Sequence, residues 1–240
     1  MLIRLKNISK KYETKQVLNN ISLEVDAGEI LAVVGFSGSG KSTILKIISG
    51  LVKQDSGEVL LGDNNIGMVF QYSALFDSLT VYENIAFALK ERDDFKKKYT
   101  ETQIKEIVAE KLKMVGLSGI EDKYPGELSG GMQKRVGFAR AIVTEPRIIL
   151  YDEPTAGLDP VSSTVIEDYI VHLKRELHAA SIVVTHQIST IKRTADRVIM
   201  IYEGEIVWQG SPVELMYTKD PYATQFFNAS REGPMVAIAG

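Results

Sequence analysis

The chain contains no cysteine, which excludes disulfide scaffolds, cysteine-ligated zinc or iron–sulfur centres and thiol nucleophiles. Long apolar runs are also lacking. The longest, around Glu29–Val34 and Ser181–Thr185, are strand-sized, whereas crossing a bilayer takes roughly 18 consecutive apolar residues. Charged residues interrupt the N-terminal sequence MLIRLKNISKKYE too often for the apolar core of a signal peptide. We therefore expect a chain that does not span a membrane and that works in the cytoplasm.

An excess of charge of one sign is absent as well. The 28 lysines and arginines nearly balance the 31 aspartates and glutamates, and the net charge is −3, so bulk positive charge does not steer the chain to nucleic acid. A hydrophobic fraction of 45% and a charged fraction of 25% are typical of a folded protein and exclude intrinsic disorder. We expect one large domain or two small ones within the 240 residues, and no nucleic-acid partner.

Hydrophobic patterns divide the chain into a β-rich start, an α/β core and an inserted helical stretch. Short alternating runs from Leu2 to Val25 predict antiparallel strands. The apolar run EILAVV followed by KSTILKIISG predicts a strand, a loop and a helix. The pattern becomes helical between about Leu79 and Val143, and strand patterns then resume in RIILYD, SIVVTH and RVIMIYEGEIVW. We therefore predict an α/β fold with a helical subdomain inserted between its two halves.

A phosphate-binding loop is predicted between the first apolar strand and its helix. The segment GFSGSGKS, Gly35–Ser42, fits the pattern G-x-x-x-x-G-K-[ST]. Its glycines allow backbone amides at the helix start to approach the α- and β-phosphates of a nucleotide. Lys41 is expected to reach the β- and γ-phosphates, and the Ser42 hydroxyl to bind Mg²⁺. The nucleotide-binding residues expected here are Gly35, Ser37, Gly38, Ser39, Gly40, Lys41, Ser42 and Thr43.

Two carboxylates end the apolar strand IILYDE, and strand ends beside such a loop are where a parallel sheet binds its ligand. Asp152 is expected to hold Mg²⁺ through water, and Glu153 to orient or deprotonate the attacking water. The alternative is that both simply end a strand in solvent. His186, at the end of SIVVT, is a candidate γ-phosphate contact, whereas His172 and His178 fall in a predicted helix and are expected to be solvated.

A second anion-binding helix start is predicted in ELSGGMQKR, Glu127–Arg135, where Ser129, Gly130 and Gly131 precede a helical pattern. Taken by itself this segment also fits an ordinary serine-capped helix. Two phosphate-binding helix starts in one chain make sense if two surfaces grip one nucleotide.

The order of these motifs resembles that of ATPase subunits of ABC transporters. The resemblance runs from Tyr12 to about Pro212, and its motifs are Gly35–Ser42, Gln71, LSGGM, Asp152–Glu153, AGLD (Ala156–Asp159) and His186. It implies an ATPase with ATP and Mg²⁺ as cofactors. It also implies a RecA-like P-loop NTPase core with an N-terminal antiparallel β-subdomain and a helical subdomain at about residues 75–145, all within a domain of residues 1–222.

The resemblance also assigns roles to single residues. Lys41, Gln71, Glu153 and His186 would be catalytic, and Gln71 would join Ser42 and Asp152 around Mg²⁺. Tyr12 matches the aromatic residue that stacks on adenine, although a tyrosine in this strand could equally be a core or surface residue. Four residues would act on the ATP of a partner subunit: Ser129, Gly130, Gly131 and Asp159.

Head-to-tail pairing of two subunits, with ATP between them, is a further implication of the resemblance. The signature loop of one subunit would close on the nucleotide of the other, so hydrolysis would open the dimer. LSGGM replaces the commoner LSGGQ, and AGLD replaces SALD. Together with Gly67–Leu89 and the tail FFNASREGP, these variants resemble the ATPases of Mla-type lipid transporters, which are built around MCE-domain proteins.

The narrower resemblance implies a subunit that energises phospholipid transport through a membrane permease, with an MCE-domain protein in the same complex. It would lie on the inner face of the cell membrane, or on the equivalent face in a plastid stroma. Two alternatives stay open: an ABC ATPase for another cargo, and a soluble ABC ATPase that serves no transporter.

Two apolar segments exceed what the ATPase core needs. The first follows Gln71, and in the family this region receives a coupling helix from the membrane subunit; its apolar residues are Tyr72, Leu75, Phe76, Leu79 and Val81. The alternative is packing within the helical subdomain. The second is a tail of residues 223–240, a candidate for docking on the sister subunit or else a frayed end. Its apolar residues are Phe226, Phe227, Met235, Val236 and Ile238.

Overall fold

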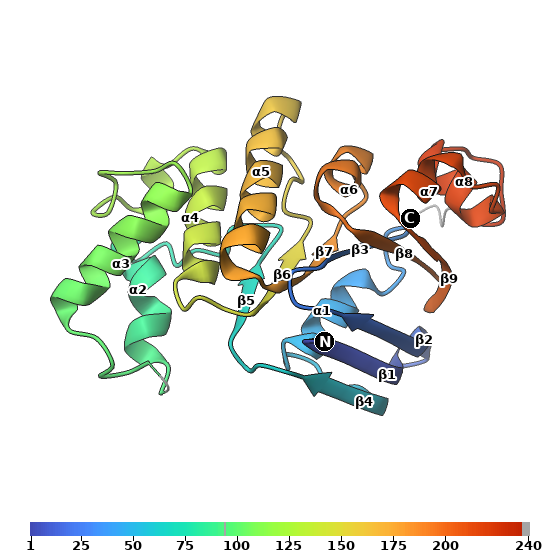
Figure 1. Ribbon diagram of the computed structural model, residues 1–240, viewed down its shortest axis with the longest axis horizontal. Coiled ribbons are helices and arrows are strands. Elements are labelled where there is room, and N and C mark those ends of the chain that lie inside the picture. The colour runs from blue at the N-terminus through green and yellow to red at the C-terminus, as the bar shows by residue number, and fades with distance from the viewer. Residues whose placement is uncertain (94, 237–240) are drawn as a thin grey trace.

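The computed structural model describes residues 1–93 and 95–236 of the chain. Two β-sheets and their covering helices make up the fold (Figure 1). A three-stranded antiparallel sheet has the order β2-β1-β4, and a six-stranded sheet has the order β5-β6-β7-β3-β8-β9. The larger sheet is parallel except for its edge strand β9, which runs antiparallel to β8. This is the α/β fold that the sequence predicts.

The strands are β1 (Ile3–Tyr12), β2 (Lys15–Val25), β3 (Ile30–Val34), β4 (Ser56–Leu61), β5 (Ile66–Val69), β6 (Ile148–Asp152), β7 (Ala180–Val184), β8 (Arg197–Tyr202) and β9 (Glu205–Gly210). The helices are α1 (Lys41–Ile48), α2 (Val81–Glu91), α3 (Glu101–Met114), the 3₁₀ turn η1 (Pro125–Glu127), α4 (Gly130–Ile142), α5 (Pro160–Leu177), α6 (Ile188–Thr194), α7 (Pro212–Tyr217) and α8 (Pro221–Phe227).

The central strands are covered on both faces. All five residues of β3 are buried, as the near-continuous apolar runs of parallel strands require. Alternate side chains of β3 enter different layers: Leu31 and Val33 pack with α1 and the small sheet, whereas Ala32 and Val34 pack beneath α6–α8. The loop between β3 and α1 therefore leaves the middle of the molecule at the carboxyl ends of the parallel strands.

Helices α2, α3 and α4 follow β5 in the chain and form a group at one end of the molecule, the green elements of Figure 1. Two of them begin with a capping box, since Thr80 and Glu83 exchange hydrogen bonds at α2, and Thr100 and Gln103 do so at α3. Their buried faces share one apolar cluster with α5 and β6. The helical stretch predicted between Leu79 and Val143 is confirmed.

The prediction that His178 is helical is wrong. The residue follows the end of α5 in the left-handed region, with φ 47°, and only His172 lies within the helix. The ring of His178 packs against Gly28, where a Cβ atom would come within 2.7 Å of it. The chain turns here because residue 178 closes the helix before β7, a C-terminal role that the apolar pattern does not encode.

The described part of the tail packs on its own chain. Met235 is 1% exposed and joins the apolar cluster of α6–α8. The Gln225 amide holds the main chain of Met235 with two hydrogen bonds of 2.8 Å, one donated and one accepted. Phe226 and Phe227 border the same cluster, while Val236 is exposed. The predicted contact residue Ile238 lies outside the described residues.

Met235→Ala is expected to destabilise the fold by about 2 kcal/mol or more, because truncating a buried methionine removes contacts and leaves a cavity. Urea denaturation of both proteins measures the change in the free energy of unfolding. Val236→Ala is the matched control, since that side chain is 72% exposed and should cost little. Equal stability of the wild type and Met235→Ala would show that the tail is not packed in solution.

None of the helices among residues 1–93 and 95–236 has the length and hydropathy needed to span a bilayer.

Candidate active site

The described residues enclose an open cavity of about 1240 Å³ around the loop between β3 and α1. Its walls come from the small sheet, the β3–α1 loop and the start of α1, the segment after β5, the ends of β6 and β7, the start of α6, and the tail. Lining residues predicted from the sequence are Tyr12, Gly35, Ser37, Gly38, Gly40, Lys41, Ser42, Thr43, Gln71, Glu153 and His186. Lining residues that the sequence did not point to include Val17, Phe36, Ile188, Phe226, Arg231 and Met235.

The β3–α1 loop is shaped by glycines that no other residue could replace. Gly35 has φ 146° and Gly40 has φ 104°, backbone conformations that side chains rarely adopt. A Cβ atom at Gly35 would lie 2.2 Å from the carbonyl oxygen of Ile201, and one at Gly40 would lie 2.7 Å from that of Val17. Helix α1 begins after Gly40 without a side-chain cap, so its first amides face the cavity as free donors for an anion.

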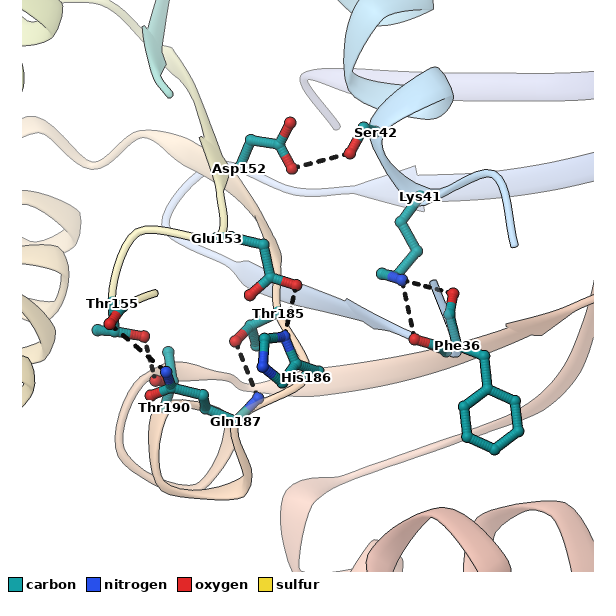
Figure 2. A network of polar contacts seen from close by, with 11 residues as sticks. Phe36, Lys41, Ser42, Asp152, Glu153, Thr155, Thr185, His186, Gln187 and Thr190 are labelled. Carbon is teal, nitrogen blue, oxygen red and sulfur yellow. Dashed lines mark hydrogen bonds and ion pairs between the residues drawn. The ribbon is translucent and has the colours of Figure 1, made fainter. Parts of the chain in front are cut away.

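The side chain of Lys41 folds back against the main chain of this loop. Lys41 is 8% exposed, and its Nζ donates hydrogen bonds of 2.8 Å to the carbonyls of Gly35 and Phe36 (Figure 2). Burial lowers the pKa of Lys41, and the carboxylates of Glu153 and Asp152 partly oppose that effect. The ammonium is thus a desolvated cation held by carbonyl dipoles, which strengthens its attraction for an anion in the cavity.

Ser42 and Asp152 meet at the start of α1 and the end of β6. The Ser42 hydroxyl donates to Oδ1 of Asp152 at 3.0 Å (Figure 2). Burial raises the pKa of Asp152, the Ser42 hydrogen bond lowers it, and nearby Glu153 raises it further. A hydroxyl and a carboxylate placed together are the oxygen donors that Mg²⁺ takes alongside water and phosphate. The residues present therefore fit Mg²⁺, although the described residues include no cluster of three His, Cys, Asp or Glu side chains.

Glu153 and His186 form an oriented pair at the ends of β6 and β7. Glu153 has φ 47°, and its amide donates to the carbonyl of Val184 at 2.9 Å, which turns its side chain into the cavity. His186 Nδ1 lies 2.8 Å from Oε1 of Glu153 (Figure 2). The other oxygen, Oε2, is buried and has no hydrogen-bond partner among the described residues. A buried carboxylate oxygen without a partner is an unsatisfied acceptor, which calls for a donor that the described residues do not supply.

Hydrogen bonds that involve two threonines tie together the loops that follow Glu153 and His186. Thr155 Oγ1 and Thr190 Oγ1 are 3.1 Å apart, and Thr190 donates to buried Glu167 at 2.8 Å. The Gln187 side chain donates to the carbonyl of Thr155 at 3.4 Å, so the loop after Glu153 is tied to the loop after His186. Sequence reasoning missed these residues because nothing in the sequence indicates that α5, α6 and the Glu153 loop pack together.

Some predicted residues do not line the cavity. The side chain of Ser39 is buried, with Oγ unpaired among the described residues. Ser129 caps α4 by accepting from the amide of Met132 at 3.3 Å, and Asp159 caps α5 by accepting from the amides of Val161 and Ser162. Ser129 and Asp159 are exposed and border other parts of the surface than this chain's own cavity.

Tyr12 and Gln71 are both exposed at the cavity wall. Tyr12 ends β1 with 43% of its surface accessible, and the ammonium of Lys10 lies 5.5 Å from its ring centre. Gln71 follows β5, two residues beyond its end. The structure thus places an aromatic face and an amide at different edges of the same cavity.

Comparisons with known proteins agree with this geometry. A family model described as ABC transporter matches residues 18–156. The chain is 45% identical to Protein TRIGALACTOSYLDIACYLGLYCEROL 3, chloroplastic, of Arabidopsis thaliana, covering 98% of this chain and 76% of that protein. It is 37% identical to the Probable ribonucleotide transport ATP-binding protein mkl of Mycobacterium leprae, over 97% and 70% of the two chains. Identity to the Intermembrane phospholipid transport system ATP-binding protein MlaF of Haemophilus influenzae is 35%, over 98% and 93%.

Among solved structures, the chain is similar to the dimeric ATP-binding cassette MJ0796 in a post-hydrolysis state bound to ADP and Pi. The TM-score is 0.79 and the sequence identity 33%, over 88% of this chain and 99% of that one. The chain therefore belongs to the ABC transporter family, and its fold is that of the family's ATP-hydrolysing cassettes.

Proposed function

We propose that two copies of this chain bind ATP between them, head to tail, and that its hydrolysis drives phospholipid transport through a membrane permease. The observation that carries the proposal is that the groups expected to bind phosphate lie on two separate parts of the chain's surface. The Gly35–Thr43 loop lines the cavity, whereas Ser129 and Asp159 are exposed and do not line it. A second copy in head-to-tail orientation would bring its own Ser129 helix start to the open side of this cavity.

Within one site, the residues divide the work as follows. Lys41 and the amides at the start of α1 bind the phosphates, and Tyr12 stacks on the base. Ser42, Gln71 and Asp152, the last through water, would hold Mg²⁺, which would neutralise phosphate charge when bound.

The chemical step rests on the oriented pair of Glu153 and His186. A carboxylate only accepts hydrogen bonds, so His186 donates from Nδ1 to Oε1 and fixes the carboxylate. Oε2 then takes the proton of the water whose oxygen bonds to the γ-phosphorus, the bond from that phosphorus to the β–γ bridging oxygen breaks, and ADP and phosphate leave. Loss of the γ-phosphate removes the bridge between the copies, so the dimer opens and the permease returns to its resting state.

A lipid cargo is supported by two of the relatives, since one is named for phospholipid transport and another for a galactolipid, and the phospholipid assignment follows the first of them. We propose that the chain is peripheral on the inner face of its membrane, with a permease and an MCE-domain protein in the same complex. The mycobacterial relative is named for ribonucleotide transport, so cargo has to be measured.

Phe76 and Phe87 form an apolar patch, which together with exposed Tyr72, four residues before Phe76 in the chain, is the proposed contact with the permease. Tyr72 is 80% exposed, Phe76 46% and Phe87 43%, and the rings of Phe76 and Phe87 lie 5.2 Å apart. The apolar segment after Gln71 thus contains both exposed and buried side chains. Tyr72 and Phe76 are exposed, whereas Val81 is fully buried and Leu75 packs against the helical cluster. Exposed aromatic rings gathered on one surface are typical of a contact with another protein.

Phe76→Asp is expected to abolish recovery of the permease with this chain after mild detergent extraction, because it places a charge in the apolar patch. Basal ATPase activity of the isolated chain should persist, since the patch lies outside the cavity. Leu51→Asp is the matched control, at a separate side chain that is 64% exposed. Recovery of wild-type protein without any integral membrane subunit, and without phospholipid, would overturn the transport proposal.

A further inference from the structure

Lys134 joins two parts of the chain that lie apart in sequence. It lies in the second turn of α4, four residues beyond Gly130. Its Nζ donates a hydrogen bond of 3.3 Å to the carbonyl of Pro154 and a closer one to the carbonyl of Ala156. Burial lowers the pKa of Lys134, and Glu153 partly opposes that effect. The ammonium is therefore held by main-chain dipoles rather than solvated at the surface.

The segment that Lys134 contacts leads directly to Asp159. It runs from Pro154 through Ala156 and Gly157, where φ is 74°, to Asp159 at the start of α5. Local turn hydrogen bonds at Ala156 and Leu158 shape it. On one side Thr155 ties it to α6, and on the other Lys134 ties it to α4.

Both ends of this link carry groups that the proposed dimer presents to the opposite nucleotide. Ser129 and Gly130 open α4, and Asp159 opens α5. Two helix starts can act together on one nucleotide only if their separation is fixed. The Lys134 ammonium donates one hydrogen bond to each of two carbonyls and so supplies that constraint.

We propose that Lys134 is a positioning residue that fixes the Ser129 helix start and the Asp159 helix start as one rigid surface, which serves the nucleotide bound by the partner copy. The proposal rests on the head-to-tail dimer put forward above. It assigns Lys134 an effect on the opposite site, although Lys134 does not line this chain's own cavity.

Lys134→Met is expected to lower the kcat for ATP hydrolysis by roughly 10-fold to 100-fold, because small displacements of groups around a reacting centre have effects of that size. The affinity of the isolated chain for ATP should not change. Lys134→Arg keeps a cation with several donors and should recover most of the activity. Lys105→Met removes an exposed lysine from α3 and controls for charge. Thermal unfolding of all three variants reports any general loss of stability.

Mixed dimers of full-length chains, isolated through two affinity tags and assayed in a single turnover, show which site Lys134 serves. In the first dimer, one copy carries Lys41→Ala and the other Lys134→Met. If Lys134 acts on the partner's nucleotide, one site keeps both residues, so this dimer hydrolyses ATP. In the second dimer, one copy is wild type and the other carries both substitutions, so each site lacks one residue and hydrolysis falls. The reverse order of activities would overturn the proposal and assign Lys134 to its own site.

The same pair of dimers made with Ser129→Arg in place of Lys134→Met tests the dimer itself. If the Ser129 pair fails to show the difference between the two arrangements, head-to-tail pairing is wrong. If the Ser129 pair shows it and the Lys134 pair gives equal activities, the dimer stands and the role of Lys134 falls.

Discussion

Glu153→Gln is expected to lower steady-state ATP hydrolysis by roughly 100-fold to 10,000-fold, the usual contribution of a positioned general base. Glutamine keeps the size of the side chain and an oxygen that can accept from His186. What it loses is the basic oxygen Oε2, which is buried and has no partner among the described residues. An amide nitrogen in its place cannot take up a proton. The chemical step therefore fails while the cavity keeps its shape.

ATP binding should survive this substitution, since Lys41 and the loop from Gly35 to Thr43 are untouched. With turnover blocked, the γ-phosphate stays in place and ATP should convert the chain to a stable dimer. Size-exclusion chromatography with light scattering, in ATP and Mg²⁺, measures this mass change. Glu106→Gln on α3 is the control, because that carboxylate is exposed and far from β6. Normal turnover in Glu153→Gln would remove Glu153 from the role of base.

The core of this site could be predicted because its motifs are local and the parallel sheet brings the residues that follow its strands together. The loop Gly35–Ser42 and the pair Asp152–Glu153 each follow an apolar strand, and parallel strands end at one edge of a sheet. Once β3 and β6 enter the same sheet, their following residues meet. The 3.0 Å contact between Ser42 and Asp152 is the direct result of two predicted strand ends lying one strand apart.

Other parts of the cavity could not be predicted, because they depend on packing between distant elements. Phe226, Arg231 and Met235 reach the cavity wall only because α8 lies against β8 and β9 and Gln225 holds the tail there. The division between exposed Tyr72 and buried Val81 likewise needs the position of α2. The number of apolar residues in a segment indicates that the segment is buried against another element, but it does not identify that element.

The family resemblance and the structure inform different residues. Resemblance names Ser129 and Asp159 as groups for a partner's nucleotide, and the structure places both away from this chain's cavity. It has nothing to say about Lys134, whose contacts with the carbonyls of Pro154 and Ala156 are visible only in the folded chain.

Lys41→Ala is expected to weaken ATP binding by about 10-fold to 100-fold, because hydrogen bonds to a charged group contribute about 1.5–3 kcal/mol. The pattern is opposite to that of Glu153→Gln, since binding is weakened and the ATP-dependent dimer should form only at a higher ATP concentration. Isothermal titration calorimetry with ATP measures the affinity. Lys46→Ala removes an exposed cation from the same helix and should bind ATP normally. Unchanged affinity in Lys41→Ala would exclude Lys41 from phosphate binding.

The buried position of Lys41 also gives ATP affinity a pH dependence. Burial lowers the pKa of Lys41, so in the free chain this ammonium loses its proton at a lower pH than an exposed lysine does. The cation is fully present below that pKa, and affinity for ATP should decline as the pH rises through it. Lys41→Arg keeps its charge over the whole range and should flatten the profile, whatever its absolute affinity. Parallel profiles for wild type and Lys41→Arg would place the titration on another group.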